Sequence, residues 1–174
     1  MTAGVSEWLT VRLARPGELE EVGRLTVEAY LADGMVNPAG SYAAALADAA
    51  RRASDAELLV AVDPDGTLLG TVTVCTPDSP LAECSRPGEL EFRMLAVAPR
   101  ARRRGVGEVL VRTVLARATE IGAHRVVLLT GEKMYAAQRL YARLGFIRVP
   151  ERDWHLRPEL RFLAFAATTA TSGP

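Results

Sequence analysis

The spacing of apolar residues divides the chain into alternating strands and helices. Alternating or continuous apolar runs predict strands at residues 8–14, 57–62, 67–76, 89–97, 125–130, 146–149 and 160–166. Apolar positions three or four residues apart predict helices at about 19–29, 106–121 and 134–144, and an Ala-rich segment without breakers predicts another at 42–53. The run RVVLLT at 125–130 is typical of a strand that is covered on both faces. The pattern therefore predicts a mixed α/β protein.

The other elements are arranged around residues 89–111. A strand ends at Val97, Pro99 stops it, and an amphipathic helix begins near Val106. The turn between them lies at a helix N-terminus, where unpaired N–H groups and the helix dipole attract anions. Two glycines, Gly105 and Gly107, leave room for a phosphate there. Four arginines add positive charge: Arg100, Arg102, Arg103 and Arg104. A solvated helix start is the alternative, but this order of features favours a pyrophosphate site.

Two motifs resemble the signatures of the GCN5-related N-acetyltransferases (GNAT). Residues 102–107, RRRGVG, resemble the R/Q-x-x-G-x-G/A signature that binds the pyrophosphate of acetyl-CoA, and LAVAP at 95–99 resembles the strand end before it. Residues 137–146, AQRLYARLGF, resemble the second signature, A-x-x-x-Y-x-x-x-G-F. The resemblance extends more loosely over about residues 10–166.

This resemblance implies the GNAT fold, an α/β (α+β mixed) fold. Its central mixed sheet has six or seven strands, flanked by about four helices. Strands four and five, here 89–97 and 125–130, would be parallel neighbours that splay apart, and the pantetheine arm would lie between them. The length suits one domain over residues 1–174, with an ordered core at about 10–166 and a mobile tail at 167–174.

The resemblance also implies a binding site for acetyl-CoA as co-substrate. The residues carried over are Leu95, Ala96, Val97, Arg102, Arg103, Arg104, Gly105, Val106, Gly107, Glu108, Ala137 and Tyr141. A backbone N–H near Leu95 would stabilise the oxyanion. Many relatives have an Asn three residues before the motif alanine that bonds the cofactor. Met134 stands there instead, so this contact is not expected.

Tyr141 matches the motif tyrosine, whose hydroxyl commonly lies near the CoA sulfur, and is the predicted general acid. The alternative is a core tyrosine. Glu91 is the first choice for the general base and Glu89 the second, since relatives often place a strand glutamate here. A structural ion pair with an arginine, or a water chain in place of a carboxylate base, stays open. Of the two histidines, His124 is expected to be exposed, and His155 is a weaker candidate near the acceptor.

Composition narrows the functional classes. The formal net charge is zero, so no overall field favours nucleic acid or an anionic membrane. Cys75 and Cys84 lack metal-ligand or disulfide spacing, so no metal is expected and both should be free thiols. The N-terminal residues show no signal peptide, and no apolar run approaches the ~20 residues that span a bilayer. These features predict a cytoplasmic protein, a monomer or homodimer.

The sequence thus predicts an N-acetyltransferase that acts by direct attack of a primary amine, of a small molecule or peptide, on acetyl-CoA. A catalytically silent CoA-binding sensor or interaction module is the alternative. Loops 31–41 and 150–158 are expected to hold the acceptor. They offer Tyr30, Asp33, Tyr42, Glu151, Asp153 and Trp154, a mixture that suits a cation. A longer acyl donor also stays open.

Overall fold

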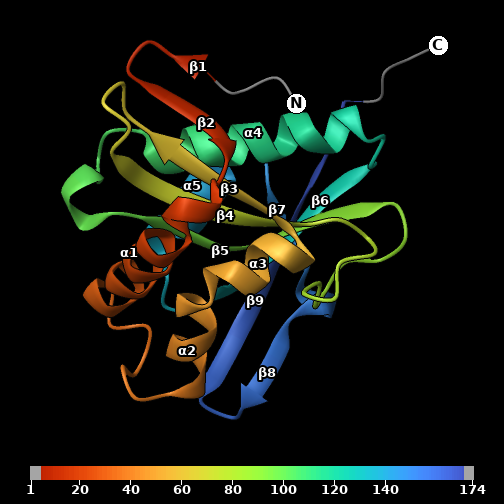
Figure 1. The fold of residues 1–174 in the computed structure, drawn as a ribbon. Helices are drawn as coiled ribbons and strands as arrows, with labels where there is room; N and C mark the ends of the chain where they lie inside the picture. The colour runs from red at the N-terminus through yellow and green to blue at the C-terminus, as the bar shows by residue number, and fades with distance from the viewer. Residues whose placement is uncertain (1–4, 171–174) are drawn as a thin grey trace.

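One mixed sheet runs through the whole described chain, residues 5–170 of the computed structural model (Figure 1). Its strand order is β1-β2-β3-β4-β5-β6-β9-β7, with β8 paired beside β9. The strands are β1 (Val5–Ser6), β2 (Leu9–Leu13), β3 (Glu57–Val62), β4 (Leu68–Cys75), β5 (Glu89–Val97), β6 (Arg125–Gly131), β7 (Ile147–Arg148), β8 (Trp154–Arg157) and β9 (Leu160–Thr168). All pairings are antiparallel except that between β5 and β6.

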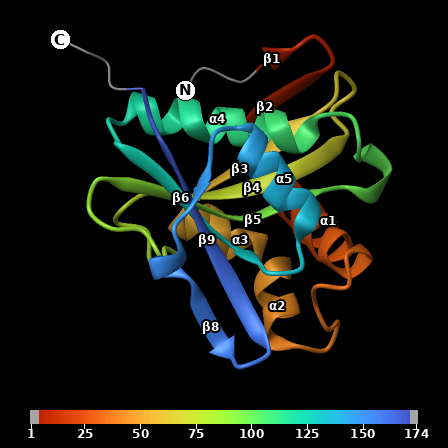
Figure 2. The ribbon, with the colours of Figure 1, turned by 180° about the vertical axis from the view of Figure 1, so that it is seen from behind.

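Helices cover both faces of this sheet. They are α1 (Leu19–Ala32), α2 (Ser41–Ala47), α3 (Ala49–Asp55), α4 (Val106–Glu120) and α5 (Tyr135–Arg143). Short 3₁₀ turns lie at Pro16–Glu18, Pro99–Ala101 and Pro150–Arg152. The two opposite views show α1, α2 and α3 on one face and α4 and α5 on the other (Figures 1 and 2). The predicted mixed α/β fold is confirmed.

The strands β5 and β6 are the parallel neighbours that the resemblance implied. Their ladder pairs Glu89 with Arg125 and ends with Glu91 opposite Val127, although β5 continues to Val97 and β6 to Gly131. Beyond this point β6 pairs only with β9 among the described strands. The second half of β5 therefore has one free backbone edge, and the predicted splay is present.

A β-bulge in β5 sets the shape of this free edge. The ladder with β4 pairs Thr73 with Arg93 and then Thr71 with Ala96, so Met94 and Leu95 together oppose Val72. Met94 takes a φ of 53°, which is uncommon for a residue other than glycine. An extra residue in a strand shifts the alternation of side chains beyond it. Because of the bulge, Glu91 and Leu95 do not share a face as strict alternation along β5 would require.

The segment predicted as one helix at 42–53 is two helices. Asp48 separates α2 from α3, and its carboxylate accepts a hydrogen bond from the backbone N–H of Arg51. A short acidic side chain that caps the next helix competes with continuation of the previous one. Five α-helices therefore stand where four were expected. The sheet also gains two short strands, β1 and β8, that hydrophobic pattern did not reveal.

The ordered core extends past its predicted end. Ala167 is buried and Thr168 closes β9, while Thr169 donates from its backbone N–H to the carbonyl of His124. Residues 167–169 are therefore part of the fold and not of a tail. Residues 171–174 lie outside the described part of the chain. Among the described helices, none combines the length and the apolar character needed to cross a membrane.

Candidate active site

The start of α4 has the geometry of an anion site. Arg103 and Gly105 take positive φ values of 62° and 80°, and Gly105 is the N-cap of the helix. The first intrahelical bond runs from Val109 N–H to the Gly105 carbonyl, so the N–H groups of residues 106–108 have no acceptor among the described residues. A Cβ at Gly105 would meet no atom within 4 Å. The space in front of these N–H groups is therefore open to a phosphate.

Glycine at position 107 also serves packing. A Cβ there would lie 3.3 Å from Leu140 of α5, closer than ordinary contact. The sequence predicted Gly107 as a cofactor residue, and the structure shows that it also lets α4 approach α5. Beside it, Val106 is buried and Glu108 forms an ion pair with Arg112, 2.9 Å away. Only the backbone of these two residues is placed to meet an anion.

The arginine cluster is partly neutralised by the protein itself. Arg102 forms an ion pair with Asp33 at 2.7 Å and donates to the Ala29 carbonyl at 3.1 Å. The Arg104 guanidinium lies 4.4 Å from the centroid of the Trp8 ring, a cation–π contact, and Arg100 donates to the Leu68 carbonyl. The side chain of Arg103 is exposed. The backbone of the turn, more than any one arginine, is therefore the main feature of the candidate anion site.

Replacing Arg102 by alanine should weaken CoA binding about two- to fivefold at low salt. This range corresponds to a charge–phosphate contribution of ~0.3–1 kcal/mol at an exposed helix N-terminus. In 1 M salt the deficit should disappear, because exposed charges are screened. Isothermal titration calorimetry at both salt concentrations checks this. Arg143→Ala, which removes an exposed charge at the end of α5, serves as the control and should change nothing. A deficit that persists in 1 M salt would contradict the assignment.

Tyr141 lies in an aromatic cluster at the side of α5 that faces the sheet. Tyr141 is 4% exposed. Its ring centroid is 5.8 Å from those of Phe92 and Phe146 and 6.1 Å from that of Phe165. Burial raises the pKa of Tyr141 above its ordinary range. The hydroxyl therefore stays protonated at neutral pH, as a proton donor must. Ala137, one turn before it, is half-buried against the same core.

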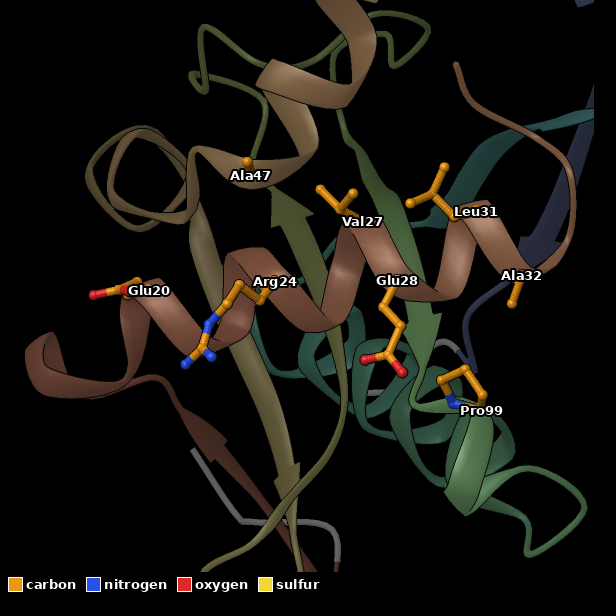
Figure 3. A pocket seen from close by; sticks show the side chains of 8 residues that line it. All are labelled: Glu20, Arg24, Val27, Glu28, Leu31, Ala32, Ala47 and Pro99. Atoms are coloured by element: carbon orange, nitrogen blue, oxygen red, sulfur yellow. The ribbon is translucent and has the colours of Figure 1, made fainter. Parts of the chain in front are cut away.

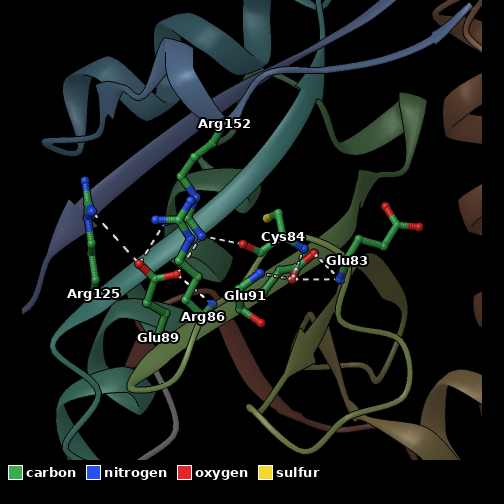
Figure 4. A network of polar contacts seen from close by, with 8 residues as sticks. Glu83, Cys84, Arg86, Glu89, Glu91, Arg125 and Arg152 are labelled. Carbon is green, nitrogen blue, oxygen red and sulfur yellow. Dashed lines mark hydrogen bonds and ion pairs between the residues drawn. The ribbon is translucent and has the colours of Figure 1, made fainter.

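Both predicted base residues belong to a polar network at the start of β5 (Figure 4). The carboxylate of Glu91 is fully buried and accepts hydrogen bonds from the backbone N–H groups of residues 83–85, at 2.9–3.1 Å. Glu89 lies 2.7 Å from Arg152 and 3.9 Å from Arg125, and accepts from the N–H of Arg86. Burial raises the pKa of Glu89, but the bonds from Arg152 and Arg86 outweigh it and lower the pKa overall. Each carboxylate thus already has several partners.

Met134 stands where many relatives carry Asn, and a second methionine, Met35, lies nearby. Met134 is the N-cap residue of α5, and the Thr130 hydroxyl lies 3.7 Å from its sulfur. A Cβ at Gly131, the last residue of β6, would lie 2.9 Å from the Met35 methyl group and 3.4 Å from Met134. Two methionines therefore flank the end of β6 beside the free edge of β5. They offer apolar contact where an amide would offer a hydrogen bond.

The two acceptor loops differ in how free their polar groups are. Asp33 is paired with Arg102, and Asp153 is paired with Arg148 and Arg161 at 2.7 and 2.9 Å. Trp154 is half exposed and stacks on Phe162, with ring centroids 5.6 Å apart. Glu151 and His155 are exposed, as is His124 in its turn. The carboxylates expected to attract a cation are thus largely engaged with arginines.

Asp153 has a structural role that a stability measurement can isolate. Its side chain is 5% exposed and accepts from Arg148, Arg161 and the backbone N–H of Ala164. Asp153→Asn should therefore lower the free energy of unfolding by about 2 kcal/mol at pH 7, the usual scale for hydrogen bonds to charged groups. Urea unfolding measures it. Asp65→Asn, in the exposed turn between β3 and β4, should leave stability unchanged.

The stability difference between the parent and Asp153→Asn should depend on pH. The hydrogen bonds from Arg148 hold the pKa of Asp153 well below its ordinary range. A carboxyl with a depressed pKa contributes stability that is complete above its unfolded pKa of about 3.9 and is lost as the pH falls through its folded pKa. The gap between the parent and Asp153→Asn should therefore narrow below about pH 4. A gap that widens in acid would contradict this.

A separate open groove of about 870 Å³ lies on the solvent side of α1 (Figure 3). Its lining residues are Glu20, Arg24, Val27, Glu28, Leu31, Ala32, Ala47 and Pro99. None of these is among the predicted cofactor or catalytic residues, and it lies outside the opening between β5 and β6. We do not assign it to the active site. Among the described residues, no three His, Cys, Asp or Glu side chains converge as a metal site requires.

Comparison with known proteins identifies the family. The sequence model of the acetyltransferase (GNAT) family matches residues 22–146, well over half of the chain. The chain belongs to the GNAT family. The matched region includes the free edge of β5, the start of α4 and Tyr141 on α5. The resemblance read from the two motifs is therefore confirmed, and with it membership of a family of enzymes that transfer acyl groups.

Individual GNAT proteins resemble the chain to different extents. N-acetyltransferase family 8 member 3 of Rattus norvegicus is 36% identical over 86 residues, which is 49% of this chain but only 36% of the rat protein. A histone acetyltransferase HPA2 and related acetyltransferase from Corynebacterium glutamicum has a TM-score of 0.73 at 22% identity, over 96% of this chain and 99% of that one. A putative acetyltransferase from Salmonella typhimurium, solved with its cofactor acetyl-CoA, has a TM-score of 0.64 at 19% identity, over 95% and 96%. These solved structures support the fold.

Proposed function

We propose that this GNAT protein transfers an acetyl group from acetyl-CoA to a primary amine of a small molecule or peptide. The observation that carries the proposal is the succession of two features in the fold. The unpaired edge of β5 ends at Val97, the open N–H groups at the start of α4 follow at residues 106–108, and the Tyr141 ring packs against Phe92 of β5. A thin carrier with a hydrogen-bonding arm and a diphosphate suits these two features. The family model and a relative solved with acetyl-CoA support this choice of donor.

The predicted cofactor residues act together in this proposal. The backbone of Leu95, Ala96 and Val97 pairs with the pantetheine arm, and that of residues 103–108 binds the pyrophosphate. Arg102 and Arg104 add long-range attraction, and Ala137 leaves space beside the arm. The substitution of Met134 for the family's asparagine replaces one polar contact with an apolar one. Binding energy should therefore come mainly from backbone groups, which a side-chain substitution does not remove.

The reaction proceeds by direct attack in this site. The neutral amine nitrogen forms a bond to the thioester carbonyl carbon, and a backbone N–H near Leu95 stabilises the oxyanion. The C–S bond then breaks, Tyr141 donates its proton to the departing thiolate, and the amide product forms. Solvent returns a proton to Tyr141 as the amine proton leaves.

Water is the favoured base in this proposal. The sequence left a strand glutamate, Glu91 or Glu89, and a water chain as alternatives. Glu91 is held by three backbone N–H groups and Glu89 by two arginines. Hydrogen bonds and ion pairs stabilise the charged carboxylate, and part of this stabilisation is lost when the carboxylate accepts a proton. An ordered water chain through the open space between β5 and β6 avoids this cost.

Thiol release from acetyl-CoA, measured against a panel of primary amines, tests the proposal. Turnover with at least one amine, together with the mass of the acetylated product, would support it. CoA binding without turnover for any amine would favour the catalytically silent sensor. Longer acyl-CoA donors in the same assay define the acyl preference. Cytoplasmic location and a monomeric or homodimeric state stay predictions, which size-exclusion chromatography and cell fractionation address.

A further inference from the structure

Two arginines share the face of the sheet that α1, α2 and α3 cover. The Arg52 Nη1 donates to the Thr73 hydroxyl at 3.3 Å, and Thr73 is directly opposite Arg93 in the β4–β5 ladder. Residues directly opposite each other on neighbouring strands point to the same face of the sheet. The guanidinium of Arg93 therefore lies on the same side as that of Arg52. Sequence analysis gave neither arginine a role in the site.

Arg52 is a buried cation without a carboxylate partner among the described residues. Arg52 is 2% exposed. Its Nη2 donates to the Leu46 carbonyl at 2.6 Å and to the Thr26 hydroxyl at 3.1 Å. Its Nε is buried and has no acceptor among the described groups. Burial lowers the pKa of Arg52 to about 10. A desolvated charge with an unused donor is costly unless something else compensates for it.

Arg93 faces a single, replaceable carboxylate. Its Nη2 lies 2.8 Å from Glu83, whose side chain is 46% exposed, and its Nη1 donates to the Leu81 carbonyl. The other acids nearby have different partners. Glu91 accepts from backbone N–H groups, and Asp48 caps α3. Glu83 is therefore the one carboxylate that these contacts provide for the charges of Arg93 and Arg52 among the described residues.

Two tyrosines, Tyr30 on α1 and Tyr42 on α2, belong to the helices that cover this face of the sheet. The rings of Tyr30 and Tyr42 meet edge to face, with centroids 6.1 Å apart. Burial, together with the nearby Tyr42 and Tyr141 hydroxyls, raises the pKa of Tyr30, and the charge of Arg93 opposes this shift. Tyr30 is thus within electrostatic range of Arg93. Its hydroxyl stays protonated at neutral pH and can donate to an anion.

We propose that Arg93, with the Arg52 charge on the same face of the sheet, binds a carboxylate on the acceptor. The acceptor would then be an amine that carries a carboxylate, such as an α-amino acid, with its amino group directed toward Tyr141. The inference rests on the proposed function and names its substrate class. It replaces the expectation of a cationic acceptor, since Asp33 and Asp153 are themselves paired with arginines.

Matched pairs of amines with and without a carboxylate test this inference. Suitable pairs are L-phenylalanine with phenethylamine, L-leucine with 3-methylbutylamine, and L-lysine with cadaverine. In at least one pair the amino acid should have a kcat/KM at least tenfold higher, which corresponds to about 1.4 kcal/mol. Equal or better rates for the decarboxylated member of every pair would overturn the carboxylate site.

Three substitutions locate the preference. Arg93→Gln should remove it, and Arg51→Gln should keep it, because Arg51 is an exposed neighbour that carries the same charge on α3. Glu83→Gln should increase the preference, since it removes the carboxylate that competes for Arg93. The carboxylate preference should fall in Arg93→Gln and rise in Glu83→Gln. General damage to the fold would not change it in opposite directions. A preference that survives Arg93→Gln would contradict the assignment.

A binding measurement keeps this test independent of catalysis. Calorimetry on the CoA-saturated protein compares N-acetyl-L-phenylalanine with N-acetylphenethylamine, and the products of the other pairs likewise. Carboxylate-dependent binding that requires Arg93, without turnover of any amine, would support the anion site and refute the proposed catalysis. Turnover without a carboxylate preference would support the proposed catalysis and refute the anion site. If no carboxylate product binds in any pair, the inference is wrong.

Discussion

Gly105→Asp should abolish measurable CoA binding, a loss of at least about 100-fold, in a protein that still folds. The new carboxylate enters the open space before the N–H groups of residues 106–108 and repels a phosphate at close range. An ion that occupies the position of a ligand phosphate removes the helix N-terminal contribution as well. Calorimetry with CoA gives the affinity, and thermal unfolding reports the fold.

A second glycine, Gly66, provides a control that distinguishes the effect of backbone strain from the effect on the binding site. Gly105 has a φ of +80°, so any side chain there is strained by about 1–2 kcal/mol. Gly66, in the turn between β3 and β4, has a φ of +84° and equally open surroundings. Gly66→Asp should therefore lose similar stability and keep its affinity for CoA. Normal CoA binding in a folded Gly105→Asp variant would refute the pyrophosphate site.

Tyr141→Phe should reduce turnover by ~10²-fold or more, the lower end of the usual scale for a lost general acid. The ring remains among Phe92, Phe146 and Phe165, so packing and thermal stability should change little. CoA affinity should stay within about threefold, since the hydroxyl acts on charge that develops only during the reaction. Steady-state kinetics with the best amine, together with CoA titration, measures both quantities.

The control is Tyr135→Phe, an exposed tyrosine on the same helix, which should behave as the parent. Because burial raises the pKa of Tyr141, its proton should stay in place and cause no loss of rate at neutral pH. A Tyr141→Phe variant as active as the parent would mean that water supplies the proton. Loss of CoA binding together with activity would show that the hydroxyl holds the cofactor, and the acid role would then lack support.

Sequence patterns could not reveal the proposed carboxylate site for the acceptor. Arg52 stands in an Ala-rich helical segment and Arg93 within a strand, and neither spacing connects them. They share one face of the sheet because β4 and β5 place Thr73 opposite Arg93, while the Arg52 side chain of α3 donates to the Thr73 hydroxyl. A single signal was available. An arginine on the apolar face of a predicted helix is unusual, because charged residues are rarely buried without a partner.

The sequence by itself determined most of the helices and strands and the glycine-containing turn at the start of α4. Local chemistry sufficed there, since Pro99, Gly105 and the amphipathic pattern after Val106 act on neighbouring residues in the chain. Only the tertiary structure decided the environments of Glu89 and Glu91, the bulge at Met94 and the division of the second helix at Asp48. Contacts between residues distant in sequence fix these features. Glu89 meets Arg152 across 63 positions, and a periodic pattern carries no information about which side chain will face a given charge.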